Sequence, residues 1–156
     1  MDTNKITLDE KDLQILTIVE HDARLSIREI AAKVHLSPTP VHGRLKRMEQ
    51  AGVIKGYGAL LDSRKIGKGI IVICQVTLKE HNKQAAREFI KAIHSFKEVV
   101  ECYNIAGDFD FMLRIVTESM ETYHDFFVNK LSEAAYIGQT KSIFVMDVIK
   151  QTHVML

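Results

Sequence analysis

The chain has 156 residues, of which 46% are hydrophobic and 26% charged, with only two Pro and two Cys. That length and apolar fraction suit one domain or two small ones, and they exclude a disordered or collagen-like chain. Two Cys cannot staple a secreted mini-protein, and no C-x-x-C or H-E-x-x-H spacing predicts a metal site. The N-terminal residues are polar, and the longest aliphatic run, 70–73, is far too short to span a bilayer. We therefore expect a cytoplasmic protein with reduced thiols.

The charge is unevenly distributed, although the formal net charge is only +1. Residues 1–68 hold 12 Lys+Arg and 9 Asp+Glu, a net charge of +3, whereas residues 69–156 hold 9 and 11, a net charge of −2. Between residues 35 and 55 the single acid is Glu49, against four basic residues: Arg44, Lys46, Arg47 and Lys55. This segment is either a phosphate-binding surface or an ordinary solvated helix face, and charge by itself favours the second.

Three short helices are predicted in the first 52 residues. Asp9 caps the first helix, which ends near residue 21, and Ser26 caps the second with a capping box. The third begins at Ser37. Its side chain can cap only the Thr39 N–H, because Pro40, which follows Thr39, has no N–H to donate. It ends at residue 52, and residues 53–61 are expected to form a strand pair or an extended wing.

In the second half of the chain, the pattern of apolar residues predicts strands as well as helices, in the order βαββαβ. Two helices are expected over 84–93, with Ile90 among the buried residues, and from Ser119 to 131. Strands are predicted at 70–78, 99–105, 111–116 and 143–149. This order gives a ferredoxin-like (ACT-like) plait, with two helices on one face of a four-stranded antiparallel sheet. The expected fold is α+β, with domains at 1–61 and 69–156.

The first and last predicted strands carry apolar residues on both faces. Helices can cover only one face of such a sheet, so the other face must meet something else. A second copy of the chain is the favoured partner, because a plait of this size cannot leave so much apolar surface in water. The alternative is that the chain's own wing or tail covers this face.

The third helix has two contrasting faces. Its aliphatic residues share one side: Val41, Leu45 and Met48. The other side is polar or lacks a side chain: Thr39, His42, Gly43, Lys46, Arg47 and Gln50, with Arg44 flanking the aliphatic stripe. A short connection to the preceding helix makes the pair a helix-turn-helix, whose second helix enters the major groove of DNA.

Chemistry suggests roles for these side chains. Residues near the start of the helix, Thr39 and His42, can reach bases or phosphates, whereas Lys46 and Arg47 reach phosphates. The candidate DNA-binding residues are Arg28, Ser37, Thr39, His42, Arg44, Lys46, Arg47 and Lys55. Gly43 on an exposed helix face costs about 1 kcal/mol relative to Ala. It indicates either close approach of the backbone to a duplex or a tolerated substitution.

Several segments, in order along nearly the whole chain, resemble the Lrp/AsnC family (leucine-responsive regulatory protein and its relatives). They are 8–16 (LDEKDLQIL), 36–41 (LSPTPV), 44–45 (RL), 48–49 (ME), 52–54 (GVI) and 107–110 (GDFD). The resemblance implies a winged helix-turn-helix, a hinge strand and an amino-acid-sensing plait that forms dimers and often octamers. Gly43 is a departure, because relatives often carry a larger or basic residue there.

The turn at 107–110 can be read in two ways. Gly and Asp suit a tight turn between strands, and exposed carboxylates with turn amides can also grip a zwitterion. The resemblance implies the second, with segment 138–142 of a neighbouring subunit completing an effector pocket and Asp108 accepting the ammonium group. The candidate effector-binding residues are Gly107, Asp108, Phe109, Asp110, Gln139, Thr140 and Ser142. No catalytic residue, cofactor or metal is expected.

The sequence therefore predicts a sequence-specific DNA-binding transcriptional regulator modulated by a small amino acid. Its expected partners are double-stranded DNA and further copies of itself. One alternative is a haem-biosynthetic decarboxylase of related architecture, whose tetrapyrrole pocket requires clustered His or Arg that the sequence does not show. Another is a DNA-compacting architectural protein without an effector.

Overall fold

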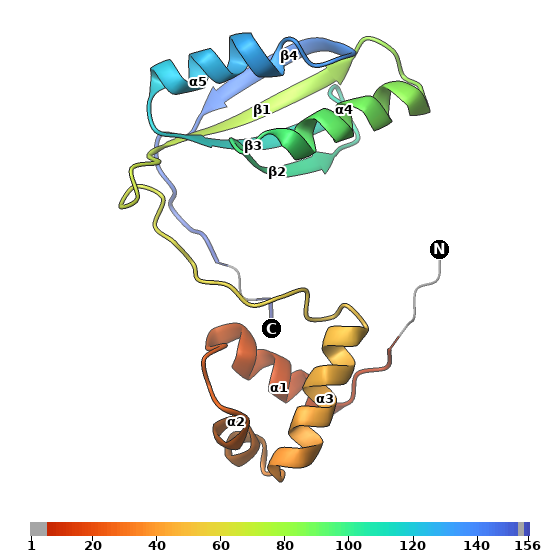
Figure 1. The fold of residues 1–156 in the computed structure, drawn as a ribbon, viewed down its shortest axis with the longest axis vertical. Coiled ribbons are helices and arrows are strands. Elements are labelled where there is room, and N and C mark those ends of the chain that lie inside the picture. The colour runs from red at the N-terminus through yellow and green to blue at the C-terminus, as the bar shows by residue number, and fades with distance from the viewer. Residues whose placement is uncertain (1–5, 153–154) are drawn as a thin grey trace. The chain divides into compact units, whose positions relative to one another are not determined.

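The computed structural model describes residues 6–152 and 155–156, which fall into two compact units (Figure 1). The first unit comprises the described residues of Met1–Leu60 together with those of Lys150–Leu156, and the second is Leu61–Ile149. Each has its own cluster of buried side chains. Within the described residues, every helix is too short or too polar to cross a bilayer.

The first unit is a bundle of three helices, α1 (Glu10–His21), α2 (Ile27–Val34) and α3 (Pro38–Gln50). The predicted capping boxes at Asp9 and Ser26 are confirmed. His35 ends α2 in the left-handed conformation, with φ of 55°. Lys11 Nζ donates to the Val34 carbonyl at 2.8 Å, so α1 also satisfies an orphan acceptor at the end of α2. The core joins all three helices through Ile15, Leu16, Ile30, Ala31, Val34, Val41, Leu45 and Met48.

The two ends of α3 answer two sequence predictions. Ser37 is the N-cap by conformation, but its side chain makes no capping hydrogen bond, so the predicted bond to Thr39 is wrong. Pro38 already removes one of the N–H groups that need a partner. After Gly52, whose φ is 71°, residues 53–61 form no strand pair, because they have no ladder partner among the described residues. The extended-wing alternative stands, and Tyr57 Oη ties it to Glu49 Oε1 at 2.8 Å.

The second unit confirms the predicted βαββαβ plait. Its elements are β1 (Ile70–Leu78), α4 (Lys83–Ser95), β2 (Val99–Asn104), β3 (Phe111–Thr117), α5 (Met120–Phe126), a π-helical turn (Phe127–Leu131) and β4 (Ile137–Phe144). The strands lie in the order β2-β3-β1-β4, and each neighbouring pair is antiparallel. Both helices pack on one face of the sheet, where Phe89 and Phe126 meet Val72, Cys74 and Val76 (Figure 1).

Two details of the plait differ from the prediction. The last strand is 137–144 rather than 143–149, because its pairing with β1 runs from Leu78↔Ile137 to Val72↔Phe144 and β1 begins at Ile70. A strand that continued to residue 149 would run past the end of its partner. Ile90 is 41% exposed rather than buried, since it lies about 100° around α4 from the buried stripe.

The other face of the sheet carries no helix. Ile71 and Val116 lie on it and are only 8% and 9% exposed, whereas Ile73 is half-buried and Ile143 is 42% exposed. Alternation along the strands places these residues opposite the helix-covered core. An apolar sheet face without a covering layer within its own unit is the observation that bears on self-association.

Candidate nucleic-acid interface and effector site

The outward face of α3 carries polar side chains that lie in solvent. Thr39, His42 and Lys46 are exposed, and among the described residues none of them has a hydrogen-bond or ion-pair partner. The inward face holds Val41, Leu45 and Met48 in the core, as the aliphatic stripe predicts. The helix therefore presents free donors and a free cation to whatever approaches from outside.

Two of the predicted phosphate contacts are held by acids of α1. Arg44 Nη1 lies 2.6 Å from Asp9 Oδ2 and 2.8 Å from Asp12 Oδ1. Arg47 Nη2 donates to Asp12 Oδ2. We call these four residues the acid–arginine cluster. Its centre, Asp12, is 0% exposed, whereas the Arg44 and Arg47 side chains keep 27% and 48% of their exposure.

The charges of the cluster are mutually stabilised. Burial raises the pKa of Asp12, but hydrogen bonds from the Asp9 N–H and both guanidinium groups outweigh it, so the pKa lies below its ordinary value. The hydrogen bond from Arg44 lowers the pKa of Asp9. Asp9 and Asp12 in turn raise the pKa of Arg44. Both carboxylates are therefore ionised at neutral pH, and Asp12 is a buried charge with partners on each oxygen.

Sequence reasoning missed Asp12 altogether and treated Asp9 only as a cap. Asp9, the N-cap of α1, lies three residues before Asp12 in its first turn, and Arg44 lies three residues before Arg47 on α3. Residues at that spacing share a helix face, so the matching of two acidic with two basic positions was a usable signal. The pairing itself is tertiary, across more than 30 residues of sequence.

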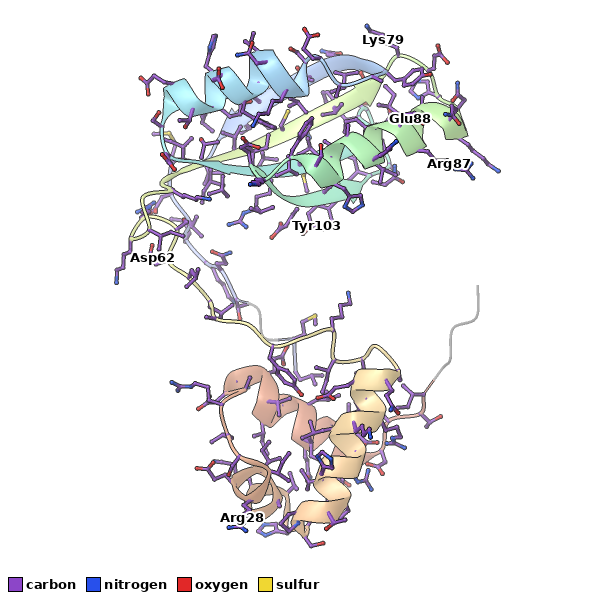
Figure 2. The ribbon with its side chains drawn as sticks, in the orientation of Figure 1. Arg28, Asp62, Lys79, Arg87, Glu88 and Tyr103 are labelled. Atoms are coloured by element: carbon purple, nitrogen blue, oxygen red, sulfur yellow. The ribbon has the colours of Figure 1, made fainter. Side chains whose placement is uncertain are left out.

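The remaining candidate DNA contacts lie on the same unit. Arg28 projects outward from α2 (Figure 2), and Ser37 and Lys55 are also exposed. Gly43 lies in mid-helix on the exposed face, and a Cβ placed there would meet no heavy atom within 4 Å. Nothing in the unit's own packing therefore requires a glycine at this position.

The two predicted effector segments flank the same end of β1. The turn carrying Asp110 lies on the β3 side, where Asp110 Oδ2 accepts from Leu78 N at 2.7 Å and Asp110 N donates to Val76 O at 2.9 Å. The segment carrying Thr140 lies on the β4 side, where Thr140 pairs with Val76. Within one chain the two segments are thus separated by a single strand, about 10 Å across.

The β4 side of this region is irregular. The pairing of β1 with β4 shifts register between Val76 and Leu78, and Gln139 N donates to Thr77 Oγ1 at 2.8 Å. A Cβ on Gly138 would lie 3.1 Å from Thr77 Oγ1 and 3.2 Å from Thr77 O, tighter than most Cβ contacts in proteins, so Thr77 would have to shift slightly. A bulge of this kind is common beside functional sites. Gly138 therefore serves close strand contact.

The candidate effector residues differ in how free they are. Gly107, with φ of 141°, and Asp108 are exposed, and in the described part of the chain the Asp108 carboxylate has no partner. Asp110 is committed to Leu78 and lies 3.3 Å from His81 Nδ1. Ser142 faces the helix layer, where its hydroxyl hydrogen-bonds Tyr123 Oη. Phe109 and Thr140 are half-buried, and Gln139 is exposed.

No cluster of three or more His, Cys, Asp or Glu suited to a metal ion occurs within residues 6–152 and 155–156. The two cysteines are free thiols, Cys74 buried and Cys102 exposed. Burial raises the pKa of Cys74 to about 11, which keeps it a neutral thiol.

Comparison with known proteins covers both units. Residues 8–55 match the family described as winged helix-turn-helix DNA-binding, and residues 71–155 match the Lrp/AsnC ligand binding domain. The chain is 36% identical over 145 residues to the proline dehydrogenase transcriptional activator of Rhizobium radiobacter, covering 93% of each.

Solved structures of similar proteins extend this comparison to the fold. An AsnC family transcriptional regulator from Agrobacterium tumefaciens is 33% identical, with a TM-score of 0.88 over 96% of this chain and 97% of that one. A transcriptional regulator from Neisseria meningitidis in complex with L-Met is 29% identical, with a TM-score of 0.89 and the same coverage. The agreement in fold extends through both units.

Proposed function

This chain belongs to the Lrp/AsnC family of transcriptional regulators, and we propose that it reads specific DNA sequences with α3 under the control of a small amino acid. The names of its relatives identify it as a DNA-binding regulator and not as an enzyme, which argues against the decarboxylase alternative. The observation that carries the proposal is the outward face of α3, with free donors at its start and a free cation further along.

The proposed DNA contacts divide by chemistry. Thr39 and His42, near the N-terminus of α3, are assigned to base edges, because recognition helices place their first residues in the major groove. Lys46 and Arg47 on α3, with Arg28 and Lys55 outside it, are assigned to phosphates. Ser37, exposed and without a capping bond, is free to join them. Arg44 is instead held by the carboxylates of Asp9 and Asp12.

The proposed effector is a small amino acid bound beside the end of β1. Support comes from the family match over residues 71–155 and from the L-Met complex of the Neisseria meningitidis relative. In this chain the free carboxylate of Asp108 suits an ammonium group, and the turn amides around Gly107 suit a carboxylate. Thr140 and Gln139 are the proposed contacts from the β4 segment, supplied by a neighbouring subunit.

We further propose that the open sheet face holds a second copy of the chain. Ile143, which is 42% exposed, and the half-buried Ile73 support this, because water is a poor partner for apolar side chains on a sheet face. Paired chains present two α3 helices, which suits half-sites about 34 Å apart, one helical turn of DNA. An effector that favours one arrangement of subunits then alters DNA affinity by linkage. Association of such dimers would give higher assemblies such as octamers. Because its proposed partner is DNA, we place the protein in the cytoplasm.

One experiment tests this function as a whole. The full chain is used to enrich duplexes from a random-sequence library, and the enriched duplex is titrated with and without each of the twenty amino acids at 1 mM. We expect one recurrent sequence and a change of affinity with at least one amino acid. Equal binding to enriched and scrambled duplexes would instead identify an architectural DNA-compacting protein. Sedimentation of the same sample reports the oligomer, and a monomer would contradict the pairing.

A further inference from the structure

The DNA-binding unit buries a charged side chain, Asp12, between α1 and α3. Asp12 is a charged side chain with 0% exposure, and burying a carboxylate is expensive unless every oxygen is paired. Asp12 Oδ1 accepts from Arg44, and Asp12 Oδ2 accepts from Arg47 and, at 3.0 Å, from the Asp9 N–H. The carboxylate is thereby held in one orientation, and it holds both arginines of α3.

The two arginines are held differently. Arg44 contacts two carboxylates, those of Asp9 and Asp12, and its side chain is 27% exposed. Within the described residues, Arg47 contacts Asp12 alone, and its side chain is 48% exposed. A guanidinium has five N–H donors, so Arg47 keeps donors that face solvent after its bond to Asp12. Two carboxylates balance the charge of Arg44, and less of its side chain than that of Arg47 is exposed to solvent.

We propose that Asp12 is a positioning residue for the DNA contact: it locks Arg44 as a brace between α1 and α3 and aims Arg47 at one backbone phosphate. This rests on the proposed use of α3 in DNA binding. An arginine already held by a carboxylate loses less side-chain freedom on meeting a phosphate than a free one does. The phosphate contacts of α3 are then Lys46 and Arg47, and Arg44 contributes none.

The opposite role for Asp12 makes an opposite prediction. If its carboxylate merely competed with phosphates for the two arginines, removing its charge would free both of them for DNA. Affinity and its salt dependence would then both rise. If Asp12 aims Arg47, removing its charge weakens binding and lowers the salt dependence. The sign of the change separates the two roles.

The test measures Kd for the enriched duplex against KCl concentration, using the full chain. Each protein–phosphate contact contributes about 0.9 to the slope of log Kd against log salt. Three variants each remove one positive charge from α3: Arg44→Met, Lys46→Met and Arg47→Met. Lys91→Met removes an exposed charge from α4 as the matched control. Because the proposed dimer brings two α3 helices to the duplex, each substitution removes two contacts, and we expect Lys46→Met and Arg47→Met each to lower the slope by about 1.8. Arg44→Met and the control should leave it unchanged.

Asp12→Asn provides the direct arm. We expect a slope lowered by about 1.8, as in Arg47→Met, and no further fall when the two changes are combined. Loss of helix packing alone would move the melting temperature but not this slope, so the slope separates positioning from stability. If Asp12→Asn does not fold, Arg44→Met and Arg47→Met still test the proposal, because it requires a slope loss in Arg47→Met and none in Arg44→Met.

Three results would overturn the proposal: tighter binding by Asp12→Asn, a slope loss in Arg44→Met, or an unchanged slope in Arg47→Met. Failure of the wild-type chain to enrich any duplex would remove the DNA-binding proposal as well. That failure is recognised before any variant is made.

Discussion

Gly43 offers a sharp test of how closely α3 approaches DNA. A glycine in a helix interior costs about 1 kcal/mol relative to alanine, because the unfolded chain has more backbone freedom to lose. The Cβ of an alanine at this position would meet no heavy atom within 4 Å, so no packing cost offsets the gain. Gly43→Ala is therefore expected to stabilise the DNA-binding unit by about 1 kcal/mol, or roughly 4–8 °C in its melting temperature.

The expected effect on DNA binding has the opposite sign. If the missing side chain allows the backbone of α3 to approach the duplex, the added methyl group weakens binding at every salt concentration. Hydrogen exchange of peptides from α3 in the full chain measures the stability, and titration of the enriched duplex measures the affinity. Ala32→Gly, a substitution at an exposed position of α2, is the matched control for helix propensity. It should destabilise the helix, and so should not slow hydrogen exchange.

Two outcomes would refute this reasoning in different places. Faster exchange in Gly43→Ala would show that the glycine relieves a contact in the folded unit. Slower exchange with unchanged or tighter DNA binding would show that close approach of the backbone is not needed, leaving Gly43 a tolerated substitution.

Three further predictions concern the charges, the thiols and the effector turn. The lowered pKa values of Asp9 and Asp12 give stability that is complete above their ordinary value of 3.8 and lost as pH falls through the folded values. Acid should therefore release exchange protection in α1 and α3, and Asp12→Asn should flatten that dependence. Iodoacetamide at pH 8 should modify the exposed Cys102 first and spare the buried Cys74 until the plait unfolds, as mass spectrometry would reveal; equal rates would argue against the burial of Cys74. Asp110→Ala should cost about 1–3 kcal/mol, because it strands the Leu78 N–H, whereas Asp108→Ala should leave the melting temperature unchanged and abolish its rise with the active amino acid. If Asp108→Ala lowered the melting temperature and Asp110→Ala abolished the response to the amino acid, Asp108 would be the structural residue and Asp110 the effector contact.

Much of the fold follows from local signals in the sequence. The side chains of Asp9 and Ser26 mark helix starts because they satisfy nearby N–H groups, an interaction that needs no knowledge of the rest of the chain. The spacing of Val41, Leu45 and Met48 likewise predicts which face of α3 is buried. These features depend on residues within one or two turns of each other.

What the sequence did not reveal depends on distant partners. The end of β4 is set by where β1 begins, some 70 residues earlier in the chain, and no pattern within 143–149 reports it. Arg44 and Arg47 look like free cations in the sequence, and only the packing of α1 on α3 brings Asp12 against them. The free carboxylate of Asp108 and the committed one of Asp110 are equally indistinguishable until the hydrogen bond to Leu78 is seen.

Each half of the chain buries its own set of side chains, and in the described residues the two sets have no member in common. Exchanging one unit between relatives would therefore leave the buried cluster of the other unit unchanged. Under the proposed function, a recombinant that takes Leu61–Ile149 from one parent and the remaining residues from another would combine the second parent's operator preference with the first parent's response to an effector. Modular inheritance of this kind offers a simple route by which one architecture acquires many pairings of gene and signal.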